Sequence, residues 1–285
     1  VTNQLRHPIR RTRVTATVHD MTVALAPELH TPGNVAADAR FTENVLRRAA
    51  GLIAVSENTR RDVVSLLGVP EQRIEVIYPG VDDRFREVTP ETVAGTIRRL
   101  GIGKLYILFL GTVEPRKNLD RLLDAWSQLQ PSLAGTVELV VAGPAGWSSA
   151  STLARLRAPA RGVRYLGYVD EADLPALTAG AMIFAYPSLY EGFAHPVAQA
   201  IAAGVPVLTS DVSSLPEVAG EGGLLVDPRS VGEIRDGLQR LLTSRSLRER
   251  LAAAGREHSE LFRWEECARR SVGFFRRIAS AACIG

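Results

Sequence analysis

The chain has 285 residues, of which 46% are hydrophobic and 23% charged, the composition of an ordinary globular protein with room for two modest domains. No apolar run approaches the roughly 20 residues of a transmembrane helix, and no apolar segment of a secretory signal follows the N-terminal arginines. The two cysteines, Cys267 and Cys283, predict neither a disulfide framework nor a metal site, so we expect a reducing, cytoplasmic environment.

The net charge of +3 is unevenly distributed, because nine arginines stand against five glutamates from Arg245 onward. This basic C-terminal segment fits either contact with an anionic membrane surface or an ordinary solvated helix face. Nucleic-acid binding is not supported, since no recognised basic motif accompanies the charge. Only two lysines occur in the chain, Lys104 and Lys117, so a lysine at position 117 stands out where arginine is the usual cation.

Short apolar strands alternate with helical segments along the chain, which is the pattern of parallel sheets with βαβ connections. In chain order the predicted strands are Arg13–Val18, Leu52–Val55, Ile74–Ile77, Leu105–Leu110, Val137–Val141, Val163–Leu166, Ala181–Ala185, Val205–Leu208 and Leu224–Val226. The clearest predicted helices are Val35–Ala50, Glu57–Leu67, Asn118–Leu129 and Val231–Leu242. Three polar residues are predicted to cap helices: Ser56, Asn118 and Ser230.

A domain boundary is predicted within residues 78–90, which combine turn residues and charges with little periodicity. Three predicted strands precede this boundary and six follow it. Because a doubly wound domain usually has more than three strands, we expect an α/β protein whose N-terminal domain is incomplete.

The C-terminal stretch from Leu261 to Phe275 has helical spacing. Its apolar residues Trp264, Ala268, Val272 and Phe275 fall on one face. We expect this face to be packed in the core, and the alternative is an amphipathic helix that lies on a membrane.

The run from Tyr190 to Thr209 is the most informative part of the sequence. It follows a predicted strand and reads as a polar loop with Glu191, a helix that begins near Pro196 and ends at Gly204, and a further strand. This arrangement aims a carboxylate and unpaired helix N–H groups at one point, which suits a sugar that carries a phosphate.

A second run, from Gly111 to Lys117, lies between a predicted strand and a predicted helix. Arg116 and Lys117 therefore belong at the carboxyl end of a parallel strand, where ligands of α/β proteins bind. The alternative interpretation is a pair of charges that only caps the helix.

These runs resemble the sequence motifs of retaining family 4 glycosyltransferases. Residues 190–209 are similar to the family's E-x7-E signature within E-G-F-x-x-P. Further segments resemble the family in the same order: His19–Met21, Ala54–Arg60, Val76–Asp82, Gly111–Leu119, Leu215–Gly220 and Leu225–Pro228.

The resemblance implies the GT-B fold, which has two Rossmann-like domains. It predicts an acceptor-side domain at residues 1–88, a nucleotide-sugar-binding domain at 89–260, and a C-terminal helix at 261–285 that crosses back to the first domain. The first domain is expected to be incomplete, because nothing before Val14 matches the family's opening strand and Gly-rich loop.

The resemblance also assigns roles to individual residues. Arg116 and Lys117 would neutralise the departing nucleoside diphosphate without a metal, although Thr112 stands where the family usually has an arginine. Glu191 would hold the donor sugar, and Gln199, in place of the second Glu, would hold the ribose without a charge. The remaining expected site residues are His19 near the sugar and its phosphate, and Gly111, Thr112, Gly192, Phe193 and Glu217 on the donor.

Two of these positions also have simpler interpretations. His19 could be a structural histidine at a strand end, and Glu217 could form a loop salt bridge or a cap.

The implied activity is transfer of a hexose, with retention, from a nucleotide sugar to a glycan or lipid-linked acceptor. GDP-mannose is the first expectation for the donor, no cofactor or metal is required, and peripheral contact with the inner membrane is an open alternative. A non-catalytic nucleotide-sugar-binding remnant or partner subunit is the second hypothesis, favoured by Gln199 and the missing first strands. We also expect little transferase activity from this chain alone. A sugar-nucleotide epimerase of the same fold is disfavoured by the P-R-K-N and E-G-F motifs.

Overall fold

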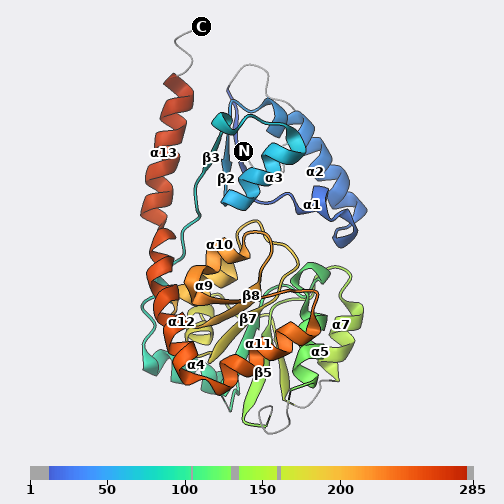
Figure 1. Cartoon of the computed structure of the whole chain (residues 1–285), viewed down its shortest axis with the longest axis vertical. Coiled ribbons are helices and arrows are strands. Elements are labelled where there is room, and N and C mark those ends of the chain that lie inside the picture. Colours follow the sequence, from blue (N-terminus) through green and yellow to red (C-terminus); the bar gives the residue numbers. More distant parts are fainter. Residues whose placement is uncertain (1–12, 104, 130–134, 159–161, 281–285) are drawn as a thin grey trace. The chain divides into compact units, whose positions relative to one another are not determined.

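The computed structural model describes residues 13–103, 105–129, 135–158 and 162–280 (Figure 1). Lys104 and Cys283 lie outside the described residues. The chain divides into two compact units, one of residues 1–80, 191–193 and 261–285, and one of residues 81–190 and 194–260. Both units contain parallel sheets with helices, so the predicted α/β class is confirmed.

The first unit is built on a three-stranded parallel sheet in the order β1-β2-β3. The strands are β1 (Thr15–Val18), β2 (Gly51–Ala54) and β3 (Ile74–Val76). The helices are α1 (Thr22–Leu25), α2 (Pro32–Asn44), α3 (Glu57–Leu67) and α13 (Trp264–Ser280). The predicted cap at Ser56 is confirmed, because its side chain accepts a hydrogen bond from the Thr59 N–H.

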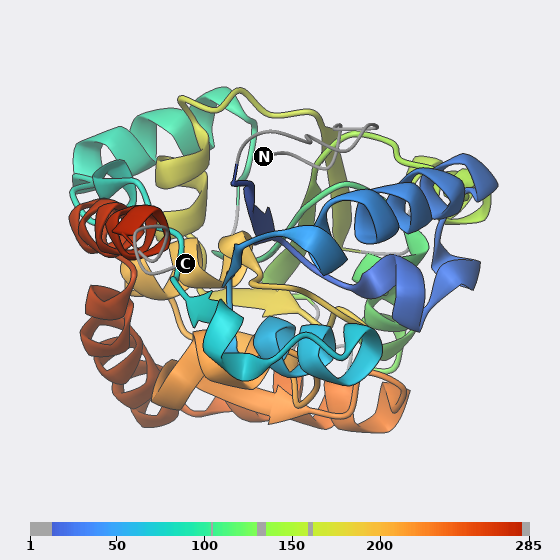
Figure 2. The same ribbon diagram turned by 90° about the horizontal axis from the view of Figure 1, so that it is seen from above.

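The side chains of β2 alternate between the two faces of this small sheet, and both faces are covered by helices. Leu52 and Ala54 face the main core of the unit, whereas Ile53 joins a second cluster with Ile77 and Phe274 of α13. Figure 2 accordingly shows α13 on one side of the three strands and α2 and α3 on the other.

The orientation of α13 corrects the sequence prediction. Trp264, Val272 and Phe275, which were expected in the core, are 51%, 46% and 49% exposed, and Ala268 is also exposed. The buried face carries Phe274 instead, because the helix has two adjacent apolar stripes and its pattern alone does not select between them.

The selection of the buried stripe is explained by charge as well as by packing. Arg270 and Arg277 of α13 both form ion pairs with Glu75 of β3, which hold the Phe274 stripe against the sheet. Within the described residues, no helix is long and apolar enough to cross a bilayer.

The second unit contains a six-stranded parallel sheet in the order β6-β5-β4-β7-β8-β9. The strands are β4 (Leu105–Leu110), β5 (Val137–Ala142), β6 (Val163–Gly167), β7 (Ile183–Tyr186), β8 (Val207–Ser210) and β9 (Gly223–Val226). The strand order reverses between β4 and β7, which makes the carboxyl ends of these two strands the topological switch point of the sheet.

Helices cover both faces of this sheet (Figure 1). They are α4 (Pro90–Arg99), α5 (Leu119–Ser127), α7 (Ala150–Arg157), α8 (Leu174–Ala179), α9 (His195–Ala202), α10 (Leu215–Ala219), α11 (Val231–Thr243) and α12 (Arg245–His258). Helices α5 and α11 pack together, whereas α4, α8 and α9 form another set. The central strands are therefore buried, as their continuous apolar sequences predict.

Candidate functional site

The loops that follow β4 and β5 are bound closely to each other. Gly111 donates its N–H to the carbonyl of Ala142 at 2.9 Å, and a Cβ at Gly143 would lie only 2.0 Å from the Gly111 oxygen. Gly143 also has a φ of 140°, a conformation that side chains rarely adopt. A glycine is thus needed at position 143 to bring the two loops together, and Gly111 and Thr112 are fixed at the carboxyl end of β4.

Two cations follow within this loop, in a 3-10 turn that spans Pro115–Lys117. The Nη2 atom of Arg116 lies 2.8 Å from Oε1 of Glu114, and its Nη1 donates to the carbonyl of Tyr190 at 2.9 Å. The ammonium of Lys117 lies 5.2 Å from the ring centroid of Tyr186, the last residue of β7. The structure therefore brings Lys117 to the switch point between β4 and β7.

Asn118 joins three loops at this end of the sheet. Its Nδ2 donates to the carbonyls of Pro187 and Pro228, at 2.8 and 2.7 Å. The predicted side-chain cap at Asn118 is wrong, because the residue has a φ of 59° and its side chain makes no capping bond to α5. The left-handed backbone turns the amide toward the loops after β7 and β9 instead.

The segment after β7 is held by polar residues that sequence analysis did not select. Ser188 Oγ donates to the carbonyl of Arg116 at 3.0 Å, and Ser210 Oγ donates to the carbonyl of Ser188 at 2.6 Å. Their signal in the sequence is weak, since each is a small hydroxyl residue at the end of an apolar strand. Together they fix the chain up to Tyr190.

Helix α9 begins at His195, and its N-cap residue Ala194 has a φ of 69°, which is unusual for a residue with a side chain. Such strained positions are found preferentially at functional sites. Gln199 lies in the second turn of α9 and is partly exposed. A helix N-terminus favours a negatively charged ligand, as the sequence predicts for this point.

Within the first unit, Gly192 lies directly against the end of β1. A Cβ at Gly192 would lie 1.7 Å from the His19 carbonyl oxygen, so no other residue fits there without movement. The buried hydroxyls of Ser56 and Thr59 donate to the Gly192 carbonyl at 2.6 and 3.1 Å. The structure thus brings His19 and Gly192 together, and Ser56 has a role beyond the predicted cap.

Three of the predicted residues, His19, Glu191 and Phe193, have distinct surroundings. His19 is exposed, and the neighbouring Asp20 accepts a hydrogen bond from the Thr22 N–H at the start of α1. Glu191 is buried. The ring of Phe193 is also buried, in edge contact with Phe262 at a centroid distance of 5.1 Å.

Glu217 lies in the first turn of α10 in the second unit. Its carbonyl oxygen is 2.9 Å from Nε2 of His258, so its backbone is tied to the end of α12. No group of three or more acidic, histidine or cysteine side chains that could hold a metal occurs among the described residues.

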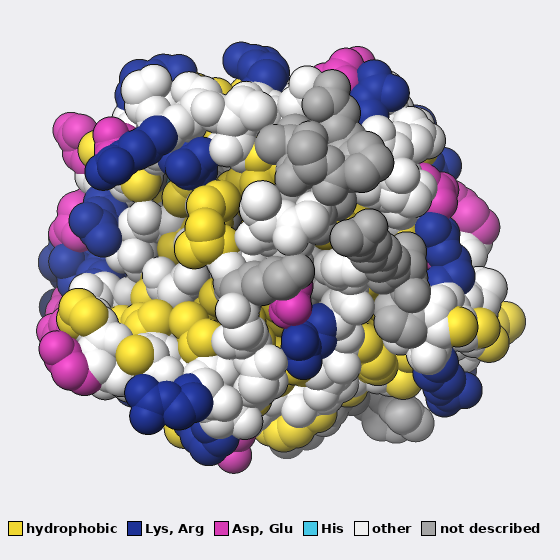
Figure 3. Space-filling model, turned by 90° about the horizontal axis from the view of Figure 1, so that it is seen from below, with side chains coloured by type: hydrophobic (Ala, Val, Ile, Leu, Met, Phe, Trp, Pro, Cys, Tyr) yellow, Lys and Arg dark blue, Asp and Glu magenta, His cyan; other side chains and the backbone are white. Residues whose placement is uncertain are grey.

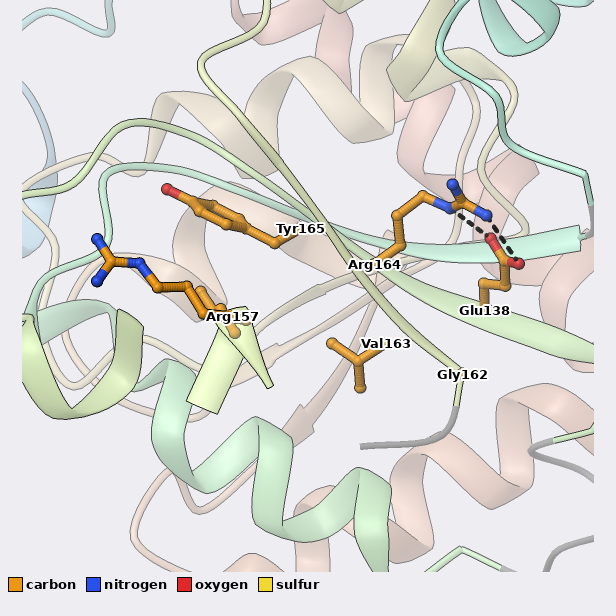
Figure 4. Close-up of a pocket in the computed structure, with 7 residues that line it drawn as sticks. Glu138, Arg157, Gly162, Val163, Arg164 and Tyr165 are labelled. Carbon is orange, nitrogen blue, oxygen red and sulfur yellow. Dashed lines mark hydrogen bonds and ion pairs between the residues drawn. The ribbon is translucent and has the colours of Figure 1, made fainter. Parts of the chain in front are cut away.

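A hollow lies elsewhere on the second unit (Figure 4). It has a volume of about 580 Å³ and is lined by Arg157, Arg164 and Tyr165, with Arg164 paired to Glu138 at 3.0 Å. Residues at the start of β5 and β6 form it, whereas ligands of parallel sheets bind at the carboxyl ends. The lower face of the molecule shows apolar and charged side chains intermixed (Figure 3). We place the candidate site at Lys117, because it lies at the carboxyl ends of β4 and β7.

The parallel sheets of the two units are those of the GT-B fold, and sequence comparison identifies the family. Residues 97–258 match the family described as Glycosyl transferases group 1, and residues 3–85 match Glycosyltransferase Family 4. The chain belongs to this glycosyltransferase family, and the predicted family and enzyme class are confirmed.

Individual relatives support this assignment. The chain is 33% identical to O-antigen chain mannosyltransferase B of Escherichia coli over 95% of this chain and 72% of that protein. It is also 33% identical to D-inositol 3-phosphate glycosyltransferase of Nocardioides sp., over 82% of this chain but only 55% of that protein.

A solved structure has the same fold. The Anabaena Alr3699/HepE structure in complex with UDP and glucose superposes with a TM-score of 0.74 at 22% identity, over 96% of this chain and 72% of that one.

Proposed function

We propose that the chain is a retaining hexosyltransferase that uses a nucleotide sugar, with GDP-mannose as the leading donor and a glycan or lipid-linked molecule as the acceptor. The observation that carries this proposal is Lys117 at the carboxyl ends of β4 and β7, where its ammonium group lies 5.2 Å from the ring centroid of Tyr186. The choice of mannose is supported by the mannosyltransferase among the relatives.

The reaction breaks the bond between the sugar C1 and the β-phosphate oxygen, and forms a bond from C1 to an acceptor hydroxyl oxygen. Negative charge develops on the departing diphosphate, where Lys117 provides a fixed positive charge without a metal. The hydroxyl proton is transferred toward the departing phosphate, so that no protein nucleophile is required.

The other predicted residues take supporting roles in this proposal. Glu191 accepts hydrogen bonds from sugar hydroxyls, Gln199 bonds the ribose hydroxyls, and His19 contacts the sugar and its phosphate. The donor is further contacted by the backbone or side chains of Gly111, Thr112, Gly192, Phe193 and Glu217. Phe193 contributes through its backbone, because its ring is buried.

Calorimetric titration with GDP, UDP, GDP-mannose and UDP-glucose tests the proposal, together with assays of donor hydrolysis and transfer. We expect the guanosine compounds to bind more tightly than the uridine compounds, and Lys117→Ala to weaken all four. Arg98→Ala, which removes an exposed cation of α4, serves as the matched control. Absence of binding by any nucleotide, or equal effects of the two variants, would refute the assigned site.

The second candidate is a chain that binds a nucleotide sugar without transferring it. It is favoured by Gln199, since a neutral amide makes weaker hydrogen bonds to hydroxyls than a carboxylate does. Tight binding without hydrolysis or transfer would support this alternative, and turnover would exclude it.

A peripheral contact with the cytoplasmic face of a membrane is also part of the proposal. It is supported by the exposed stripe of Trp264, Val272 and Phe275 on α13, which lies next to the exposed Arg269 and Arg276. Amphipathic helices with aromatic and basic residues bind anionic lipids in this way. Flotation with anionic and neutral vesicles tests it, and equal recovery with both would contradict the electrostatic part.

A further inference from the structure

The charge of Arg116 is already neutralised inside the protein. The side chains of Arg116 and Glu114 are only 13% and 3% exposed, and their closest atoms are 2.8 Å apart. Removing one partner of such a buried pair leaves a charge without compensation, which is strongly unfavourable. Arg116 therefore cannot move to a ligand phosphate without leaving the Glu114 carboxylate buried without its cation.

Arg116 also binds the segment after β7 through both its backbone and its side chain. Its carbonyl accepts hydrogen bonds from the Leu189 N–H at 2.8 Å and from Ser188 Oγ at 3.0 Å. Its Nη1 donates to the Tyr190 carbonyl at 2.9 Å. These bonds fix the peptide group that joins Tyr190 to Glu191.

Lys117 follows Arg116 in the same turn. Its ammonium group lies over the ring of Tyr186, and the residue is partly exposed. Lys117 is thus placed at the switch point of the sheet, whereas the guanidinium of Arg116 is directed to Glu114 and Tyr190.

We propose that Arg116, held by Glu114, is a positioning residue that orients the peptide before Glu191, and that Lys117 supplies the charge for the diphosphate. This inference rests on the proposed function, in which Glu191 holds the donor sugar. The pair then affects recognition of the sugar, whereas Lys117 affects recognition of the diphosphate.

Two ligands separate these roles, because GDP has the diphosphate without the sugar and GDP-mannose has both. For Arg116→Gln we expect the GDP affinity to stay within about twofold of the unchanged protein. We expect the GDP-mannose affinity to fall by about tenfold, the lower range for a hydrogen bond to a charged group. Lys117→Ala should lower both affinities.

Glu114→Gln gives a second test, because the two interpretations predict different changes in the affinity for GDP. If Arg116 were a phosphate ligand, removing the Glu114 charge would release the guanidinium and tighten GDP binding. If Arg116 is a positioning residue, the bond to Tyr190 loosens, so GDP-mannose binds more weakly and GDP binds as before. The variant that combines Glu114→Gln and Arg116→Gln should then bind GDP-mannose no more weakly than either single variant, since both substitutions remove the same interaction.

Each protein is titrated with both ligands by calorimetry, after thermal melting has established that it is folded. If the unchanged protein binds neither ligand, the proposed function fails. If it binds both, but Arg116→Gln loses GDP affinity as Lys117→Ala does, or Glu114→Gln gains it, the positioning role fails while the function stands. Should Glu114→Gln not fold, Arg116→Gln with the two ligands decides the question.

Discussion

Replacement of Asn118 by alanine is expected to destabilise the second unit strongly. Asn118 is buried, and its Nδ2 donates to the carbonyls of Pro187 and Pro228, while Arg121 Nη1 donates to its Oδ1 at 2.8 Å. The residue has a φ of 59° and a ψ of 31°, a conformation that asparagine tolerates better than alanine. The substitution therefore removes two bonds to the loops and adds backbone strain.

The magnitude follows from these contributions. A typical hydrogen bond contributes about 1 kcal/mol, and a buried group left without a partner costs about 1–3 kcal/mol. The left-handed backbone adds about 1 kcal/mol for alanine. We therefore expect Asn118→Ala to lower the free energy of unfolding by about 4 kcal/mol, and Asn118→Gly, which has no such strain, by about 1 kcal/mol less.

The free energy of unfolding is measured by urea titration, with tryptophan fluorescence as the signal. Trp126 is buried in α5 of the same unit and reports on its unfolding. Asn34→Ala, on the exposed surface of α2, is the control and should change stability by less than about 0.5 kcal/mol. A loss below about 1 kcal/mol for Asn118→Ala would refute the contribution assigned to its two hydrogen bonds.

Three further predictions concern ligand binding and pH. Lys117→Ala should weaken GDP and UDP binding by at least about 1.5 kcal/mol in calorimetry, with Arg98→Ala unchanged. Gln199→Glu should preserve or tighten nucleotide binding, because a carboxylate makes stronger bonds to hydroxyls, and a large loss would mean that Gln199 does not face the ribose. The hydrogen bond from Arg99 holds the pKa of Asp173 below its usual value. The stabilisation by this interaction is therefore present above about pH 4, the ordinary pKa of an aspartate, and is lost as the pH falls through the pKa of Asp173 in the folded protein. Asp173→Asn should therefore cost at most about 1 kcal/mol in urea titrations at neutral pH, and progressively less at acidic pH.

The secondary structure was predictable where the sequence has a strong local pattern. All nine predicted strands are present, and the predicted bounds of β4 (Leu105–Leu110) and α3 (Glu57–Leu67) coincide with the structure. Continuous apolar runs and clear caps produce such signals. The order of the strands in the sheet could not be predicted in this way. The reversal between β4 and β7 depends on which faces of the helices pack, and no local sequence pattern specifies that.

The site was predictable only in part, for a similar reason. The sequence places Lys117 at a strand end, because the strand Leu105–Leu110 and the following helix are both clear. It does not reveal that Arg116 binds Tyr190, since the two residues are 74 positions apart. Nor does the sequence show that Asn118 has a left-handed backbone and makes no side-chain cap, because an asparagine before a helix is also typical of a capping residue.

Substitution of the two phenylalanines of α13 tests which apolar stripe of this helix packs against the sheet. Phe274 is 1% exposed and lies near Gly51, where an added Cβ would meet its ring, whereas the adjacent Phe275 is 49% exposed. Phe274→Ala should therefore cost about 3–5 kcal/mol of stability, as buried aromatic truncations do, and Phe275→Ala about 1 kcal/mol or less. Urea titration followed by helical circular dichroism, with hydrogen exchange of the β2 amides to report on the first unit, measures both. Equal losses, or a larger loss for Phe275→Ala, would mean that α13 packs through the stripe of Trp264, Val272 and Phe275 and that Phe274 does not hold the helix against the sheet.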